Sequence, residues 1–139
     1  MRFGLFQSVQ LPDPKSEARY YKEALEQVVW AEKLGFDSAW LTEHHFSRHG
    51  IVSSTMSLLA YLAGVTERIR LGTAVIVLPF HNPIQLAEEV ATVDLLSDGR
   101  MDFGVLPGRK ATLQITDAAF GPDGQLRAEW QAGMVEMMQ

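Results

Sequence analysis

Short apolar runs alternate along the chain with longer stretches in which apolar residues recur at helical spacing. The runs 3–7, 38–41, 69–77 and 101–106 have the length and composition of strands, and the third is rich in β-branched residues. The stretches between them place apolar residues on one helical face, namely Tyr21, Leu25 and Val28, then Met56, Leu59 and Leu62, then Ile84, Ala87, Ala91 and Leu95. This pattern predicts the order β-α-β-α-β-α-β.

Several helix boundaries are marked by residues with clear capping chemistry. Gly35 can close the first helix in a left-handed conformation, and Ser53 or Ser54 can start the second. Asn82 followed by Pro83 predicts the start of the third helix, because asparagine caps helices well and proline suits the first helical position.

Strands that recur about every 30–35 residues with helices between them predict parallel pairing, since each unit has the size of a βαβ crossover. Two architectures fit this pattern, a doubly wound sheet and a (β/α)8 barrel. A complete barrel takes about 250 residues, so four strands within roughly 105 residues match the pace of half a barrel. Beyond them, residues 107–123 are predicted to form a loop, and Leu126, Trp130, Met134 and Met137 have helical spacing.

Composition and charge narrow the class of protein. The chain has 139 residues, of which 47% are hydrophobic and 21% charged, and this suits one globular domain over residues 1–139. A net charge of −5 without a lysine or arginine run gives no nucleic-acid footprint. No apolar stretch is long enough for a membrane span, and the N-terminus does not fit a signal peptide. The absence of cysteine excludes disulfides and fits a cytoplasmic location.

The loop after Leu41 is the most informative candidate site. Ligands of parallel α/β proteins bind beyond the carboxyl ends of the strands, and here Glu43, His44 and His45 follow a strand directly. A histidine can transfer protons near neutral pH, and an adjacent carboxylate can fix its tautomer. Adjacent side chains point different ways, so at most one of the two histidines is expected to face the pocket. Strand capping or backbone hydrogen bonds are equally good explanations, and with His49 these residues match no zinc spacing.

Two other strand ends carry candidate cofactor contacts. At the third, the small residues Gly72, Thr73 and Ala74 would let a flat ring lie close to the backbone, although a buried strand has the same composition. At the fourth, Gly104 is followed at 107–110 by proline, glycine, arginine and lysine, which could hold a phosphate or form a solvated basic turn. No Walker or dinucleotide-binding fingerprint is present.

Four motifs, taken in order, resemble bacterial-luciferase-like flavin-dependent monooxygenases. They are MRFGLF at 1–6, GFDSAWLTEHHF at 35–46, IRLGTAV at 69–75, and a series of shorter matches through 81–100. Each motif alone is weak, but their order and intervals over residues 1–105 are typical of this family. The resemblance implies an α/β fold that is the N-terminal half, about four β/α units, of a (β/α)8 TIM barrel.

The resemblance also implies a chemistry: reduced FMN and O2 acting on a small organic substrate, with the flavin performing the oxygen chemistry and the protein managing protons. In this family the first histidine of the matching pair is a catalytic base and acid, and its neighbour is needed for activity. By resemblance these roles fall on His44 and His45, with Glu43 beside them.

The cofactor contacts that the resemblance implies are Thr73, Ala74, Val75, Leu106 and Arg109. In the family the small-residue stretch lies against the flavin ring and contains a cis peptide bond, which would fall at Ala74-Val75. An arginine after strand four often helps to hold the FMN phosphate. Pro107 occupies that place here, and Arg109, two positions on, would substitute for it.

Strands five to eight of the family barrel have no counterpart, so the chain is expected to be cut within the fold and to bind FMN weakly. Two alternatives stay open. A non-catalytic half barrel would associate, as a homodimer or with a partner chain, through its exposed sheet edges. An oxidoreductase of the same superfamily would use the deazaflavin F420 and transfer hydride. Neither nucleic acid, membrane nor metal is an expected partner.

Overall fold

A computed structural model describes residues 1–13, 16–45 and 47–106, and the predicted loop and helix beyond them lie outside the described residues. Its main sheet is parallel, with the order β1-β2-β3-β5. The strands are β1 (Gly4–Gln7), β2 (Ser38–Leu41), β3 (Arg70–Thr73) and β5 (Met101–Asp102). Their spatial order follows the chain without the reversal of a doubly wound sheet, so among the described strands the barrel order holds.

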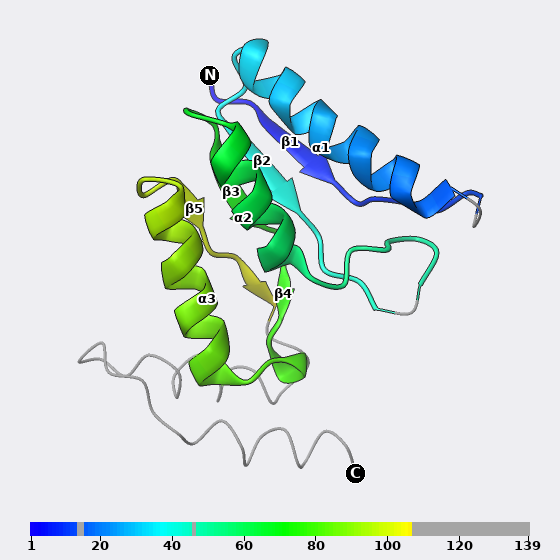
Figure 1. Ribbon diagram of the computed structural model, residues 1–139, viewed down its shortest axis with the longest axis vertical. Helices are drawn as coiled ribbons and strands as arrows, with labels where there is room; N and C mark the ends of the chain where they lie inside the picture. Colours follow the sequence, from blue (N-terminus) through cyan, green and yellow to red (C-terminus); the bar gives the residue numbers. More distant parts are fainter. Residues whose placement is uncertain (14–15, 46, 107–139) are drawn as a thin grey trace.

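Three helices lie along one face of this sheet (Figure 1). They are α1 (Glu17–Lys33), α2 (Thr55–Val65) and α3 (Pro83–Leu96). Gly35 follows α1 with a φ of 89°, as predicted for a left-handed helix end. Asn82 caps α3, because its side-chain oxygen accepts the N–H groups of Ile84 and Gln85. None of these described helices is long and apolar enough to cross a membrane.

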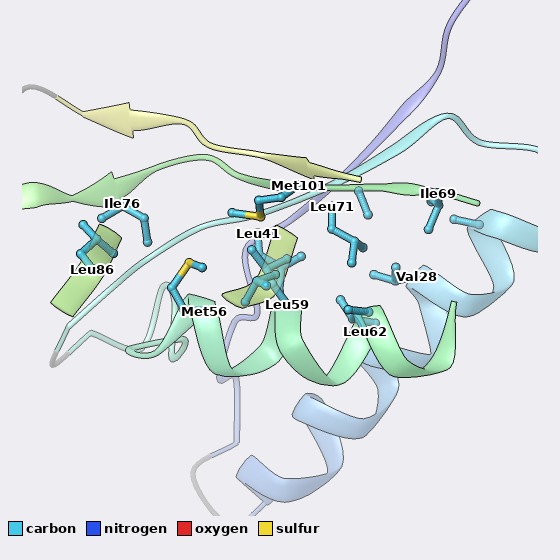
Figure 2. Close-up of a cluster of buried hydrophobic side chains, with 14 of the residues drawn as sticks. Val28, Leu41, Met56, Leu59, Leu62, Ile69, Leu71, Ile76, Leu86 and Met101 are labelled. Carbon is cyan, nitrogen blue, oxygen red and sulfur yellow. The ribbon is translucent and has the colours of Figure 1, made fainter. Parts of the chain in front are cut away.

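The hydrophobic core lies between the sheet and the helices. Side chains of neighbouring strands meet the helices in one row, which runs through Leu5, Ala39, Leu71 and Met101. Figure 2 shows these strands above α2 with the buried side chains between them, among them Leu59 and Leu62, which are fully buried. Burying a leucine contributes about 1.5–3 kcal/mol, so this row against α2 is the main source of cohesion.

The opposite face of the sheet carries the alternate row, which runs through Phe6, Trp40, Gly72 and Asp102. The Trp40 ring lies against Gly72, where a Cβ would overlap it. Phe6 is 62% exposed. This face therefore presents aromatic surface that no described element covers.

The third and fourth predicted strands are each interrupted, and their prediction as continuous strands was wrong. β3 ends at Thr73, and the chain resumes as β4 (Ile76–Val77), which pairs with β6 (Val105–Leu106) in a second small sheet. At the break, the Thr73 hydroxyl donates to the Gly104 carbonyl at 2.6 Å and accepts the Gly104 N–H at 2.8 Å. A side-chain hydroxyl thus replaces one rung of the backbone ladder, which periodicity cannot reveal.

The predicted apolar face of α3 was also wrong. Ile84 and Leu95 are 56% and 80% exposed, whereas Leu86 and Val93 are buried against the sheet. Apolar side chains cover more than one face of this helix, so spacing alone does not select the face that packs. The faces predicted for α1 and α2 are confirmed, because Val28, Met56, Leu59 and Leu62 are all buried.

Replacing Gly104 tests the break between the two sheets. A Cβ at this position would overlap the backbone oxygen of Thr73, so Gly104→Ala is expected to lower the free energy of unfolding by about 1–3 kcal/mol in urea titrations. Gly64→Ala in α2 is the matched control, since nothing lies within 4 Å of its added Cβ, and a gain of about 0.5–1 kcal/mol is expected. Equal stability of the two variants would contradict the proposed close packing.

Candidate active site

The loop after β2 is fixed to the loop after β1 by backbone hydrogen bonds. The Leu11 N–H donates to the Arg48 carbonyl, and the Ile51 N–H donates to the Val9 carbonyl, each at 2.9 Å. The Tyr21 hydroxyl of α1 donates to the Ile51 carbonyl at 2.5 Å. The segment that carries the histidines is therefore held from both sides at the carboxyl end of the sheet.

Glu43 lies at the centre of this end, and its side chain has no exposed surface. Its Oε1 lies 2.5 Å from the His45 Nε2, and its Oε2 accepts the Val77 N–H at 2.9 Å. The His81 Nε2 lies 3.0 Å from both carboxylate oxygens. A buried carboxylate needs such donors, because removal from water without them costs several kcal/mol.

The charges of this cluster are coupled. Burial alone would raise the pKa of Glu43, but the hydrogen bonds from His81, His45 and the Val77 N–H outweigh it and lower that pKa. The hydrogen bond to Glu43 raises the pKa of His81, against the opposing effect of burial. The ionised forms of Glu43 and His81 thus stabilise each other.

His44 and His45 line one open cleft together with Glu43, Val77 and Phe80, and its volume is about 530 Å³. The two rings have different surroundings, because the His45 ring contacts Glu43 and Phe80 whereas the His44 ring lies against Gly50. The expectation that at most one histidine faces the pocket stays a prediction. The His44 N–H donates to the Val52 carbonyl at 2.8 Å.

The His44 ring is seated against the backbone of Gly50. A Cβ at residue 50 would overlap that ring, so only glycine leaves it in this position. Gly50 itself bridges to Ser47 across a tight turn.

One wall of the cleft is aromatic. The His45 and Phe80 rings meet edge to face, with centroids 4.9 Å apart and planes at 74°. Phe80 ends the 3-10 helix Leu78–Phe80 and is 67% exposed. The cleft therefore combines imidazole groups that can move protons with an apolar wall that can receive a flat or hydrophobic molecule.

The predicted cofactor contacts that fall within the described residues belong to β3, to the break after it and to β6. The cis peptide bond expected at Ala74-Val75 is present. Both of these residues are partly exposed, whereas Thr73 is fully buried with its hydroxyl bonded to Gly104. Leu106 pairs through its backbone with Val77.

Arg109 and Pro107 lie outside the described residues, so the expected phosphate contact stays a prediction. Within the part of the chain that is described, no group of three or more His, Cys, Asp and Glu side chains is arranged to hold a metal ion.

His81 is the site residue that the sequence reasoning missed, since it figured only in the motif that begins α3. Its position was nevertheless a signal. A histidine directly before an Asn-Pro helix start, in the loop after the third strand, must lie at the same end of the sheet as Glu43.

Comparison with known proteins places this geometry in context. A family described as luciferase-like monooxygenase matches residues 1–129. The chain is 37% identical to an alkanal monooxygenase alpha chain of Photorhabdus laumondii, over 78% of this chain and 30% of the relative. It is also 37% identical to the oxygenase component of a flavin-dependent trigonelline monooxygenase of Acinetobacter baylyi, with the same coverage. It thus spans under a third of the length of these curated relatives.

Solved structures show the same fold. The oxygenating constituent of 3,6-diketocamphane monooxygenase of Pseudomonas putida, in complex with FMN, aligns with a TM-score of 0.74 at 19% identity, over 99% of this chain and 37% of that one. Monooxygenase RslO1 of Streptomyces bottropensis aligns with a TM-score of 0.72 at 28% identity, over 99% and 41%. The half-barrel fold predicted from the sequence is confirmed as an N-terminal part of such barrels.

Glu43→Gln tests the buried carboxylate. The amide keeps the shape but loses the charge that the two imidazoles bind, so the free energy of unfolding is expected to fall by about 2 kcal/mol. The pKa of Glu43 lies below its ordinary value of 4.5, so its contribution is present above that value and lost as the pH falls through the lower folded pKa. The pKa of His81 lies above 6.5, so its contribution is complete below that value and lost as the pH rises through the raised folded pKa.

The difference between wild type and Glu43→Gln should therefore be largest between pH 4.5 and 6.5, in urea titrations across the pH range. Glu23→Gln is the matched control, because Glu23 forms only an exposed pair with Arg19 on α1. It should leave both the stability and its pH dependence unchanged. A loss in Glu43→Gln that is the same at about pH 3 and at pH 6 would contradict the charge coupling.

Proposed function

The chain belongs to the luciferase-like monooxygenase family, and on that premise we propose that its cleft serves a flavin-dependent monooxygenation of a small organic substrate by reduced FMN and O2. The observation that carries this proposal is the cleft itself, which brings His44, His45 and the buried Glu43 carboxylate together with Phe80 at the carboxyl end of the sheet. Because the chain spans under a third of its relatives' length, the rest of a complete site would come from beyond this half barrel.

The exposure of the residues after β3 fits the approach of a flavin ring. Ala74 and Val75 are partly exposed just beyond the carboxyl end of β3, where a flat ring could approach them. Thr73 would support this segment from below through its bond to Gly104 rather than touch the ring. Leu106 and Arg109 stay proposed as contacts for the ring and the phosphate.

Proton transfer is assigned to His44. His44 lines the cleft, and a Cβ at residue 50 would overlap the place that its ring occupies. His45 is turned toward Glu43, whose carboxylate holds the His45 Nε2 and so fixes the orientation of that ring. In this division of roles the flavin supplies the oxygen chemistry, His44 takes up and returns the proton, and Glu43 with His45 keeps the wall in place.

FMN is preferred over F420 as the cofactor. The trigonelline monooxygenase, at 37% identity, is described as flavin-dependent, whereas the F420-dependent tetrahydromethanopterin reductase of Methanopyrus kandleri aligns at 24% identity and supports the fold alone. An F420-dependent hydride transfer is kept as the second choice of chemistry for the same cleft.

Removal of the His44 imidazole tests its role. With NADH, an FMN reductase, excess FMN and a straight-chain alkanal as the probe, His44→Ala is expected to oxidise the alkanal about 10²–10⁴-fold more slowly than wild type. Gly50→Ala keeps the imidazole but displaces it, and should also lose rate. His49→Gln, at an exposed histidine of the same loop, is the control. Unchanged alkanal oxidation in His44→Ala would end the assignment.

Binding of the cofactor is tested separately by titrating the 139-residue chain with FMN and with F420, followed by flavin fluorescence. Weak, saturable binding of FMN is expected, because the chain spans under a third of the length of its relatives. Preference for F420 would move the proposal to hydride transfer, and binding of neither would favour the half-barrel alternative.

That alternative, a non-catalytic half barrel that associates through its sheet, is favoured by one observation. Among the described residues, no element covers the face with Phe6 and Trp40, and β1 and β5 lie at the edges of the parallel sheet. Size-exclusion chromatography with light scattering should then report a dimer, and Phe6→Lys should shift it toward monomer. A compact monomer at all concentrations would count against association.

A further inference from the structure

We propose that His81 is a positioning residue of this cleft, holding the buried Glu43 carboxylate in the one orientation in which it binds both the Val77 N–H and the His45 ring. Among the donors to Glu43, His81 has a distinct geometry. His45 reaches only Oε1 and Val77 only Oε2, whereas the His81 Nε2 lies 3.0 Å from each oxygen. It therefore bridges the carboxylate.

Bridging matters because the terminal torsion of a glutamate is broad and roughly two-fold, with no steep well of its own. A donor on one oxygen leaves the carboxylate plane free to swing about that contact. A donor that lies between the two oxygens opposes the swing, so each oxygen stays opposite its own second partner. His81 in this way sets where the Val77 N–H and the His45 ring are held.

The imidazole of His81 is itself anchored. The anchor is at the backbone, where the N–H of His81 donates to the Leu78 carbonyl at 3.0 Å, and the side chain of the next residue, Asn82, caps α3. The start of α3 is thus tied through His81 to Glu43, and through Glu43 to β4. Val77 and Phe80, which line the cleft, lie on the segment between these two ties.

The charges around His81 favour its protonated form. Glu43 faces it from the loop after β2, and Glu89 adds a second negative charge from α3, while His45 lies on the other side of Glu43. The amino end of α3 acts against a cation at this position, which leaves Glu43 as the main support of the imidazolium. The strength of the bridge should therefore follow the protonation of His81.

The test is amide hydrogen exchange by NMR on the full chain, with Val77 as the reporter and Ile76 as the internal reference. The Val77 N–H bonds to Glu43, whereas the Ile76 N–H bonds to the Gly104 carbonyl at 3.0 Å. In His81→Leu, exchange at Val77 is expected to accelerate by about tenfold relative to Ile76. His81→Gln, which keeps an N–H donor, should recover part of the protection, and His49→Gln should change nothing.

If His81 had a merely structural role, its replacement would accelerate exchange at both amides together. That result, or an unchanged ratio of the Val77 to the Ile76 exchange rate, overturns the proposal. If the variants do not fold, the same exchange measurement on the wild type at different pH values tests the proposal. The ratio of the exchange rate at Val77 to that at Ile76 should rise as the His81 ring loses its proton, and the ¹⁵N chemical shifts of the ring report that loss. A ratio that stays constant through this titration also overturns the proposal.

For catalysis, this role rests on the function proposed above, but the exchange test needs neither flavin nor substrate. If FMN does not bind while Val77 alone loses protection in His81→Leu, the proposed function fails and the positioning role stands. If FMN binds and His44 is needed for turnover while the ratio stays unchanged, the positioning role fails and the function stands.

Discussion

A carboxylate with no exposed surface is the constraint on which the carboxyl end of this sheet depends. Glu43 can stay ionised away from water only if donors surround it, and these donors come from its own loop, from β4 and from His81, just before the Asn82 cap of α3. Each donor belongs to a different segment. The need to compensate one charge therefore ties three segments together at this end.

The rest of the molecule is organised by apolar burial, and only on one side. The row from Leu5 to Met101 packs against the helices, whereas the row from Phe6 to Asp102 faces away from them. The protein therefore has two sources of order: a core that holds the sheet to its helices, and a polar cluster that shapes the cleft. A substitution in one can leave the other largely intact, since the two lie at different levels of the sheet.

Most of the fold could be predicted because its signals are local. Asn82 with Pro83 and Gly35 mark helix ends through their own backbone preferences, and the strand at 38–41 was placed with its observed bounds. The breaks at Thr73 and Gly104 could not be predicted, since they depend on a hydroxyl meeting a backbone thirty-one residues away. The packed face of α3 was missed because apolar side chains cover more than one face of the helix. His81 was missed because its partner is distant in sequence, whereas Glu43, His44 and His45 are contiguous.

The ties between the first two loops have a consequence for how this surface can diverge. The hydrogen bonds that join Leu11 to Arg48 and Ile51 to Val9 run between backbone groups, which every residue except proline supplies. The exposed side chains of these loops are thus free to vary without moving the backbone that carries Glu43. Natural selection can change what the rim of the cleft admits while inheriting the same placement of its imidazoles, and such tolerance is what lets one scaffold diversify its substrates.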